Sequence, residues 1–359
     1  MSGLPSELPS PSLLIEADAL DRNLRAMQET CDAAGVELWP HAKTHKMVPV
    51  LRRQLELGAK GATCAKLGEA EALLESGVRR IFLAHSLADV RVAPRLRALA
   101  GKLDELILAV TSERHGAVLE DVLSAADLRV SVLMAVDTGL GREGARGPEA
   151  AARLAASIRR SSRMDLMGLY THEGHAYTAG DSRQLAEQAH ATLAACAAEA
   201  GGDLPLWPGC SVTAAWMAGL SGVKAVRPGS YVFGDLFLAE MTRVMPAEAV
   251  ALSVLATVVD RPEPGLALID AGSKVFSSDK TPDGLSARCV EHPGLVVKRL
   301  SEEHGFLTGP GVDDLPLGAR LRFTPAHVCP VVNLASRTHV VRNGELLATW
   351  PVDARGRSD

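Results

Sequence analysis

Eight short apolar segments alternate with segments of helical period between residues 36 and 233, and this alternation restricts the fold more than any other feature. Eight strands that alternate with helices are typical of a (β/α)8 TIM-type barrel. The expected strands are residues 36–39, 61–65, 81–85, 105–110, 128–136, 166–170, 204–208 and 225–233. The expected helices are residues 19–34, 68–76, 90–99, 112–124, 148–159, 181–200 and 213–220.

An open, doubly wound sheet with a dinucleotide site is the alternative fold. The run from Gly139 to Gly144 has the spelling Gly-x-Gly-x-x-Gly and follows a strand. It follows the fifth strand, however, and no acidic strand end stands at the distance that a nucleotide ribose requires. We therefore interpret the run as a turn, and a nicotinamide cofactor is disfavoured.

The sequence changes character after about residue 245, where the helical period fades. Strands are expected at residues 254–259, 266–269, 295–300, 320–324, 331–334, 338–341 and 346–350, separated by turns such as Asn343-Gly344. The prediction is a barrel domain over residues 17–245 and an all-β domain over residues 246–359. Residues 12–16 either join the β domain or lead into the barrel, so residues 1–16 are open to either assignment.

Composition excludes several classes of protein. The chain has 359 residues and a net charge of -5, which argues against a nucleic-acid partner. No apolar run approaches the roughly 20 residues of a membrane-spanning helix, and the N-terminus has no signal-peptide pattern. Six cysteines without a Cys-x-x-Cys pair are typical of a reduced, cytoplasmic protein, and Cys31, Cys64, Cys196 and Cys289 are expected in the core.

The segment Pro40-His41-Ala42-Lys43-Thr44-His45-Lys46 directly follows the first predicted strand. Partial burial and a neighbouring cation both favour the neutral amine of a lysine in such a position. A neutral lysine amine can condense with a carbonyl, including the aldehyde of pyridoxal phosphate. The alternative interpretation is a solvated basic loop.

A second group of residues suits a phosphate. Ser211 and Thr213 follow the seventh strand at the start of a predicted helix, and Gly229 and Ser230 lie in the eighth segment. Small residues, hydroxyls and free N–H groups favour an anion, and phosphate sites on this fold are frequent after strands seven and eight. Such a turn alone is most often a helix cap, but an amine after strand one together with a phosphate cradle meets both needs of pyridoxal phosphate.

The β domain carries a third signal, the sequence His327-Val328-Cys329. If these residues form a strand, the imidazole and the thiol point to the same side, which suits zinc. A buried structural pair is the alternative. Catalytic zinc usually has three protein ligands, so substrate and water would fill the open positions or a third ligand would come from elsewhere.

Taken together, these motifs resemble the fold-type III pyridoxal-phosphate enzymes of the D-serine dehydratase and D-threonine aldolase branch. The matching runs are Pro-His-Ala-Lys-Thr-His-Lys, Val-Asp-Thr-Gly-Leu-Gly-Arg, Gly-Leu-Tyr-Thr-His-Glu-Gly-His, Arg-Pro-Gly-Ser-Tyr-Val-Phe-Gly-Asp, Ser-Glu-Glu-His-Gly and Pro-Ala-His-Val-Cys-Pro-Val-Val-Asn, in order from residue 40 to 333. The resemblance implies an alanine-racemase-like barrel, a C-terminal β domain and a homodimer.

The resemblance also implies roles for individual residues. Lys43 matches the lysine that binds the cofactor covalently, Arg142 an arginine near the cofactor's phenolic oxygen, and His172 a histidine against its ring. The expected phosphate and metal ligands are Ser211, Thr213, Gly229 and Ser230, and His327 and Cys329, respectively. His41, Tyr170 and Tyr231 complete the residues expected around the cofactor, with Lys43, Tyr170 and His172 expected to be catalytic.

The metal pair bears on the reaction. In this family aldolases tend to carry His-x-Asp, which suits manganese or magnesium, whereas dehydratases carry His-x-Cys with zinc. Cys329 therefore favours a zinc-dependent dehydratase that converts a β-hydroxy D-amino acid to a 2-oxo acid and ammonia: D-serine to pyruvate, or D-threonine or 3-hydroxyaspartate to the matching product. The alternatives are a metal-dependent D-threonine aldolase that forms glycine and an aldehyde, a non-catalytic carrier of the cofactor, and a racemase.

Overall fold

The computed structural model describes residues 5–359, which form two compact units. The barrel unit comprises Ala26–Lys43, Val48–Gly229 and Arg357–Asp359, and the β unit comprises the N-terminal residues to Arg25, Thr44–Met47 and Ser230–Gly356. The segment Thr44–Met47 thus belongs to the β unit although barrel residues precede and follow it in the sequence.

The barrel unit contains all eight strands that the sequence predicts, and every strand pairs in parallel with its neighbours. They are β2 (Glu37–Leu38), β3 (Ala62–Cys64), β4 (Arg80–Leu83), β5 (Glu105–Val110), β6 (Val130–Ala135), β7 (Met164–Tyr170), β8 (Leu206–Trp207) and β9 (Ala225–Val226). Strands β3 to β8 form one sheet in sequence order, and β2 pairs with β9. Single parallel bridges, His41 to Thr63 and Leu206 to Val223, join the two groups, so that pairing runs around all eight strands.

The eighth strand is shorter than the predicted residues 225–233. It ends at Val226, and Ser230–Val232 form a 3-10 helix, so the prediction was wrong for the second half of that segment. Pro228 explains the end of the strand, because proline has no N–H to donate to a neighbouring strand.

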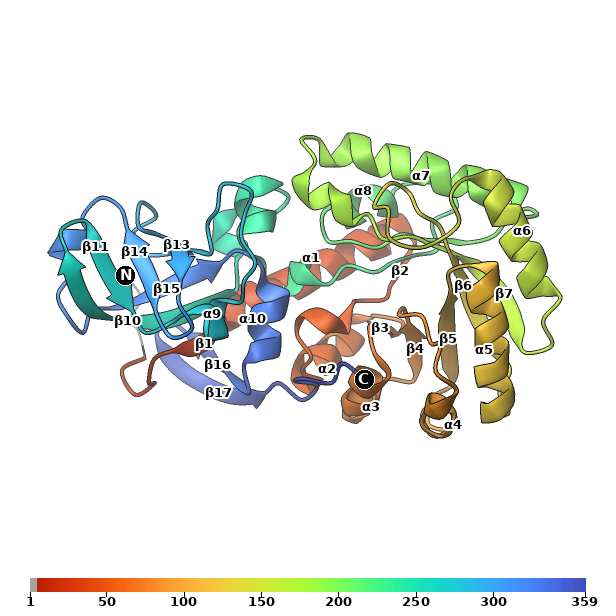
Figure 1. The fold of residues 1–359 in the computed structure, drawn as a ribbon, viewed down its shortest axis with the longest axis horizontal. Coiled ribbons are helices and arrows are strands. Elements are labelled where there is room, and N and C mark those ends of the chain that lie inside the picture. The colour runs from red at the N-terminus through yellow and green to blue at the C-terminus, as the bar shows by residue number, and fades with distance from the viewer. Residues whose placement is uncertain (1–4) are drawn as a thin grey trace. The chain divides into compact units, whose positions relative to one another are not determined.

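Helix α1 (Ala17–Ala34) precedes the first barrel strand, and its residues from Ala26 onward belong to the barrel unit. The helices that follow barrel strands are α2 (Val48–Leu57), α3 (Leu67–Ala72), α4 (Ala93–Ala100), α5 (Glu113–Ala126), α6 (Pro148–Arg159), α7 (Ser182–Glu199) and α8 (Ala214–Ala218). Helix α2 was not predicted from the sequence. Figure 1 shows α5, α6 and α7 along the outside of the strands, where they pack against β5 and β7.

The interior of the barrel is filled by side chains from most of its strands, including four large aromatic rings. Trp39 contacts Trp207 with ring centroids 5.0 Å apart, and Phe82 contacts Tyr170 at 5.1 Å, both edge to face. These rings belong to one buried cluster with Leu133 and other aliphatic residues. The core therefore comes close to the strand ends from which the polar side chains project, and it holds those ends in place.

The β unit is built on nine strands in the order β11-β14-β13-β12-β15-β10-β1-β16-β17. Because β10 also pairs with β11, six of these strands close into a small barrel, and β1, β16 and β17 extend it. The bounds are β1 (Ser12–Glu16), β10 (Leu252–Glu263), β11 (Leu266–Ile269), β12 (Ala287–Cys289), β13 (Val296–Leu300), β14 (Gly305–Thr308), β15 (Arg320–Pro325), β16 (Arg337–Arg342) and β17 (Glu345–Pro351). Residues 12–16 therefore join the β sheet, and β12 and β14 are additions to the prediction.

Two short helices interrupt the strands of the β unit, namely α9 (Ser273–Phe276) and α10 (Val328–Leu334). The strand predicted over residues 331–334 was wrong, because these residues belong to α10. Pro330 lies in the first turn of that helix, where the missing N–H of proline needs no partner, whereas a proline within a central strand would remove a ladder hydrogen bond. Over residues 5–359, no helix has the length and apolar character that crossing a membrane would require.

Candidate active site

Lys43 lies at the end of the first barrel strand that the sequence indicated. It is the middle residue of the 3-10 helix Ala42–Thr44, which follows β2. Backbone hydrogen bonds hold Pro40 and His41, which precede Lys43. The His41 N–H donates to the Pro228 carbonyl oxygen at 2.8 Å, and the Pro40 carbonyl oxygen accepts the Thr63 N–H at 2.9 Å. These backbone bonds position Lys43 at the carboxyl edge of the barrel, where chemistry gathers on this fold.

His172 is two residues beyond the end of β7 and is held as a neutral imidazole. Its Nδ1–H donates to the Gly209 carbonyl oxygen at 2.6 Å. Because a carbonyl only accepts, Nδ1 carries the proton and Nε2 is left as an acceptor. Burial, followed by the positive charge of Lys43, lowers the pKa of His172 to about 3. An uncharged, fixed ring beside a lysine suits contact with an aromatic cofactor.

A small pocket lies beside His172 at the ends of β6 and β7. The Tyr170 hydroxyl is buried there, and residues 5–359 offer it no hydrogen-bond partner. Burial raises the pKa of Tyr170 well above its usual range, so the hydroxyl keeps its proton. The pocket is lined by Ala135, Val136, Asp137, Leu140, Arg142, Glu143, Tyr170, Thr171 and His172. A buried donor without a partner and a nearby cationic side chain are the chemistry that a polar aromatic group such as pyridoxal phosphate would require.

The glycine-rich run after β6 is a turn, as we interpreted it. Asp137 accepts the N–H groups of Gly139 and Gly141, each at 3.0 Å, and Gly139 has a φ of 130° that favours glycine. Arg142 emerges from this turn and pairs with Glu143 at 3.0 Å. The turn therefore places the Arg142 side chain at the pocket.

The residues predicted to bind phosphate divide into two sets. Ser211 and Gly229 lie together in the barrel unit, since the Gly229 N–H donates to Ser211 Oγ at 3.0 Å. Thr213 instead donates its hydroxyl to Glu173 Oε2 at 3.0 Å. Ser230 and Tyr231 begin the segment Ser230–Gly356 of the β unit and are buried in the 3-10 helix Ser230–Val232.

Two buried charged residues near this site had been given no role from the sequence. Glu173 follows His172 directly, and burial raises the pKa of its carboxyl group. Arg227 donates to the carbonyl oxygens of Thr171 and Trp207, and burial lowers the pKa of its guanidinium to about 10. The sequence could have indicated Arg227, because it is a charged residue directly after an apolar barrel strand.

The proposed metal pair sits at the start of a helix and not on a strand. His327 is the residue before α10 and Cys329 is the second residue of that helix, so the expectation that alternation along a strand aligns them was wrong. Asp235 is fully buried and accepts the Val328 N–H at 3.1 Å and the Leu238 N–H at 3.0 Å. Its carboxylate thereby fixes the backbone between the two candidate ligands.

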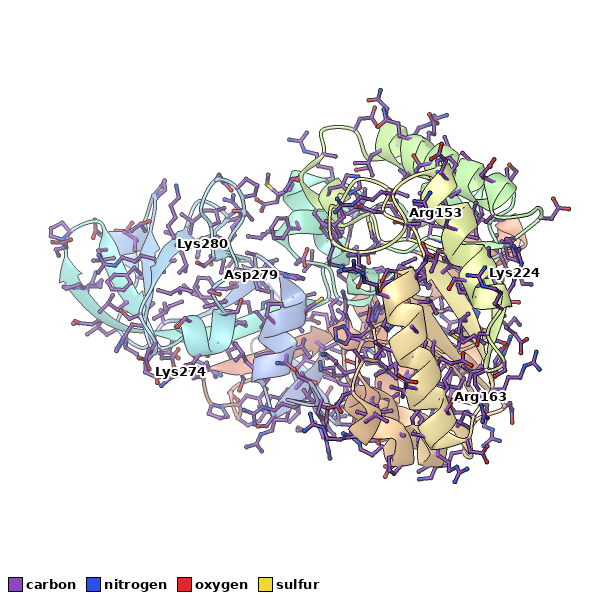
Figure 2. All side chains as sticks on the ribbon, turned by 45° about the vertical axis from the view of Figure 1, so that its right-hand side comes forward. Arg153, Arg163, Lys224, Lys274, Asp279 and Lys280 are labelled. Atoms are coloured by element: carbon purple, nitrogen blue, oxygen red, sulfur yellow. The ribbon has the colours of Figure 1, made fainter. Side chains whose placement is uncertain are left out.

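The imidazole of His327 is oriented by a carboxylate. Asp279, which is labelled in Figure 2, comes from the loop after α9. Its Oδ2 lies 2.7 Å from His327 Nδ1. Burial opposes the charged ring, but Cys329 and Asp279 together raise the pKa of His327 to about 9. Because Asp279 holds Nδ1, a metal ion would bind at Nε2, and a carboxylate behind a histidine is a frequent second partner at metal sites. The imidazole, thiol and negative surroundings fit a divalent cation such as zinc.

Within the described part of the chain, the candidate metal pair has no third histidine, cysteine or carboxylate ligand grouped with it. Among residues 5–359 there is no group of three or more histidine, cysteine, aspartate and glutamate side chains that could hold a metal ion. Two protein ligands would leave several coordination positions for substrate and water.

The fixed neutral state of His172 predicts a specific pH dependence of stability. Unfolding exposes an imidazole with an ordinary pKa near 6.5, so the unfolded chain binds one more proton than the folded chain between pH of about 3 and 6.5. Stability should therefore fall as the pH falls through this window, by up to about 1.4 kcal/mol per pH unit for this group. Urea unfolding at pH 5 and pH 6 should show a smaller decrease for His172→Gln than for wild type. Equal decreases would contradict the assignment.

Comparison with known proteins agrees with this architecture. Residues 15–236 match the family described as "Alanine racemase, N-terminal domain", and residues 251–341 match a "Putative serine dehydratase domain". The chain is 34% identical over 348 residues to D-threo-3-hydroxyaspartate dehydratase of Delftia sp. (strain HT23), covering 90% of this chain and 91% of the relative. It is 31% identical over 366 residues to D-threonine aldolase of Arthrobacter sp, covering 98% and 94%.

A solved structure extends the agreement to three dimensions. The crystal structure of D-threonine aldolase from Filomicrobium marinum superposes with a TM-score of 0.89 at 28% identity, covering 100% of this chain and 99% of the other. The matches thus extend over both units, the barrel strands and the β sheet alike. The chain therefore belongs to the pyridoxal-phosphate-dependent, alanine-racemase-fold family of lyases that includes D-threonine aldolase and D-threo-3-hydroxyaspartate dehydratase.

Proposed function

We propose that this chain is a zinc- and pyridoxal-phosphate-dependent dehydratase of β-hydroxy D-amino acids, which converts D-serine, D-threonine or a 3-hydroxyaspartate to a 2-oxo acid and ammonia. The observation that carries the choice of dehydratase is Cys329, which shares the start of α10 with His327. A thiolate and an imidazole favour zinc over manganese or magnesium. Relatives with an aldolase activity and with a dehydratase activity are about equally similar, so similarity alone does not separate the two.

The cofactor would be held by the barrel unit. Lys43 would bind it covalently, with Arg142, Tyr170, His172 and His41 around its ring. Ser211 and Gly229, with Thr213, Ser230 and Tyr231, would surround its phosphate. When bound, pyridoxal phosphate stabilises negative charge at the substrate's α-carbon. The buried Tyr170 hydroxyl and the fixed His172 ring support this placement.

The remaining chemistry falls to the protein's own side chains. The Lys43 amine, once released from the cofactor, would accept the proton from the substrate's α-carbon. His172 stays uncharged throughout the working pH range, so it can lie against an aromatic ring without adding a second cation beside Lys43. The low exposure of Tyr170 limits the access of water to that side of the pocket.

The metal would be held by His327 and Cys329. A zinc ion bound there acts as a Lewis acid that makes a β-hydroxyl a better leaving group. Asp279 orients the imidazole and Asp235 fixes the intervening backbone. Within the β unit, Thr44 Oγ1 also lies 3.2 Å from Cys329 Sγ.

A metal-dependent D-threonine aldolase is the second candidate. The Filomicrobium marinum and Arthrobacter enzymes carry that name, and the same two cofactors would serve cleavage between the α- and β-carbons. In that reaction a base takes the β-hydroxyl proton, and the products are glycine and an aldehyde.

A homodimer and a cytoplasmic location remain predictions from the sequence.

Ammonia release from a panel of amino acids tests the proposal. Purified protein with pyridoxal phosphate and zinc is incubated with D- and L-serine, D- and L-threonine, both threo-3-hydroxyaspartates and D-alanine. We expect ammonia only from β-hydroxy D-amino acids, and none after treatment with a chelator. D-Alanine is the matched control, because it lacks only the hydroxyl of D-serine. Equal turnover of L-substrates, or turnover unaffected by the chelator, would contradict the proposal.

A further inference from the structure

Thr44 makes a contact with the metal pair that neither the motif nor the proposed chemistry requires. Its Oγ1 lies 3.2 Å from Cys329 Sγ. The Thr44 side chain is 0% exposed, and within residues 5–359 its hydroxyl has no other hydrogen-bond partner. A buried hydroxyl with a single sulfur partner is oriented by that sulfur, since an unsatisfied buried hydroxyl is costly.

The direction of this hydrogen bond follows from the state of the sulfur. A cysteine that binds a metal is a thiolate, which has no proton to donate. The hydroxyl must then be the donor and Cys329 Sγ the acceptor. Hydrogen bonds to a charged acceptor are stronger than those between neutral groups, so this contact gains most when the metal is bound.

Each part of the candidate metal site has a different support. Asp279 contacts the His327 ring, Asp235 holds the Val328 N–H, and Thr44 contacts the Cys329 sulfur. All three supports belong to the β unit. The two carboxylates come from its segment Ser230–Gly356, whereas Thr44 directly follows Lys43 in the sequence. The sulfur support is therefore contributed by the segment that bears the cofactor lysine.

We propose that Thr44 is a positioning residue for the metal thiolate, and that its donated hydrogen bond holds Cys329 in its ligand orientation and reduces the electron donation of the sulfur to the metal. This inference rests on the proposed function, because it takes His327 and Cys329 as the metal ligands. Outer partners of metal ligands typically change metal affinity by about 10- to 100-fold when they are removed.

The test measures metal binding directly in the cofactor-loaded protein. Thr44→Val removes the hydroxyl at nearly constant shape, Thr44→Ala removes it without added bulk, and Thr44→Ser keeps it. Thr338→Val is the matched control, because Thr338 is also a buried threonine of the β unit and its hydroxyl donates to the Met47 sulfur at 3.7 Å. Zinc affinity is measured by competition with a chelator. The cobalt-minus-metal-free difference spectrum is recorded at equal cofactor content.

We expect Thr44→Val and Thr44→Ala to bind zinc about 10-fold more weakly and to shift the sulfur-to-cobalt charge-transfer band to longer wavelength, because the thiolate has lost a donor. Thr44→Ser and Thr338→Val should stay within about twofold of wild type, with an unshifted band. Wild-type affinity and band position in either hydroxyl-free variant would overturn the role of Thr44. Failure of the wild-type protein to bind one zinc per chain, or retention of zinc by Cys329→Ala, would instead overturn the metal pair, and the role of Thr44 with it.

Discussion

Replacement of Lys43 by alanine is expected to abolish turnover and the visible absorbance of covalently bound pyridoxal phosphate. Lys43 supplies both the covalent attachment and the amine that accepts the α-proton, and an acid–base group alone contributes about 10²- to 10⁴-fold to a rate. We therefore expect turnover to fall by at least about 10³-fold. Absorbance spectra and ammonia release under saturating cofactor measure the two effects separately.

Lys60→Ala is the matched control for this experiment. Lys60 is an exposed lysine of the barrel unit that lies just before β3, and its replacement should change neither the spectrum nor the rate. If Lys43→Ala retained the absorbance band of covalently bound cofactor, the assignment of Lys43 would be refuted, whatever the rate.

Replacement of Cys329 by alanine is expected to remove bound zinc and to reduce turnover by about 10²-fold or more, because Lewis-acid catalysis supplies several kcal/mol. Cys329→Asp should keep the fold and shift the metal preference towards manganese, because a carboxylate suits harder ions. Metal content and the rate with zinc and with manganese are measured for both variants.

Cys289→Ala is the control for the loss of a buried thiol. Cys289 is buried in the same β unit, and its thiol contacts Glu291 and not the metal pair. This variant should retain zinc and turnover. Unchanged zinc-dependent activity in Cys329→Ala would show that Cys329 is not a ligand.

The sequence predicted the barrel well because its signal is local and repeated. Each buried parallel strand is a short apolar run, and each of the eight predicted runs overlaps a strand, although the eighth ends at Val226. Helix α2 escaped prediction because Pro49 lies in its first turn and the basic motif directly precedes it. Predictions failed most where a local pattern was ambiguous, as in residues 331–334, where a short apolar run suits either a strand or a buried helix.

Part of the candidate site could be predicted because some of its residues directly follow predicted strands. Lys43 and His172 follow strands, so topology alone brings them to one edge of the barrel. Thr44, Asp235 and Asp279 act through contacts with residues more than 40 positions away in the sequence, and no local spacing indicates such contacts. Glu173 is adjacent to a predicted site residue, but only its burial distinguishes it from a surface carboxylate.

Dehydration is distinguished from aldol cleavage by the identity and ratio of the products that zinc-loaded protein forms from D-threo-3-hydroxyaspartate or D-serine, measured by proton NMR and an ammonia assay. A dehydratase forms one 2-oxo acid and one ammonia for each substrate molecule consumed, with no glycine and no aldehyde. Glycine and aldehyde in equal amounts, without ammonia, would contradict the elimination and identify the chain as an aldolase.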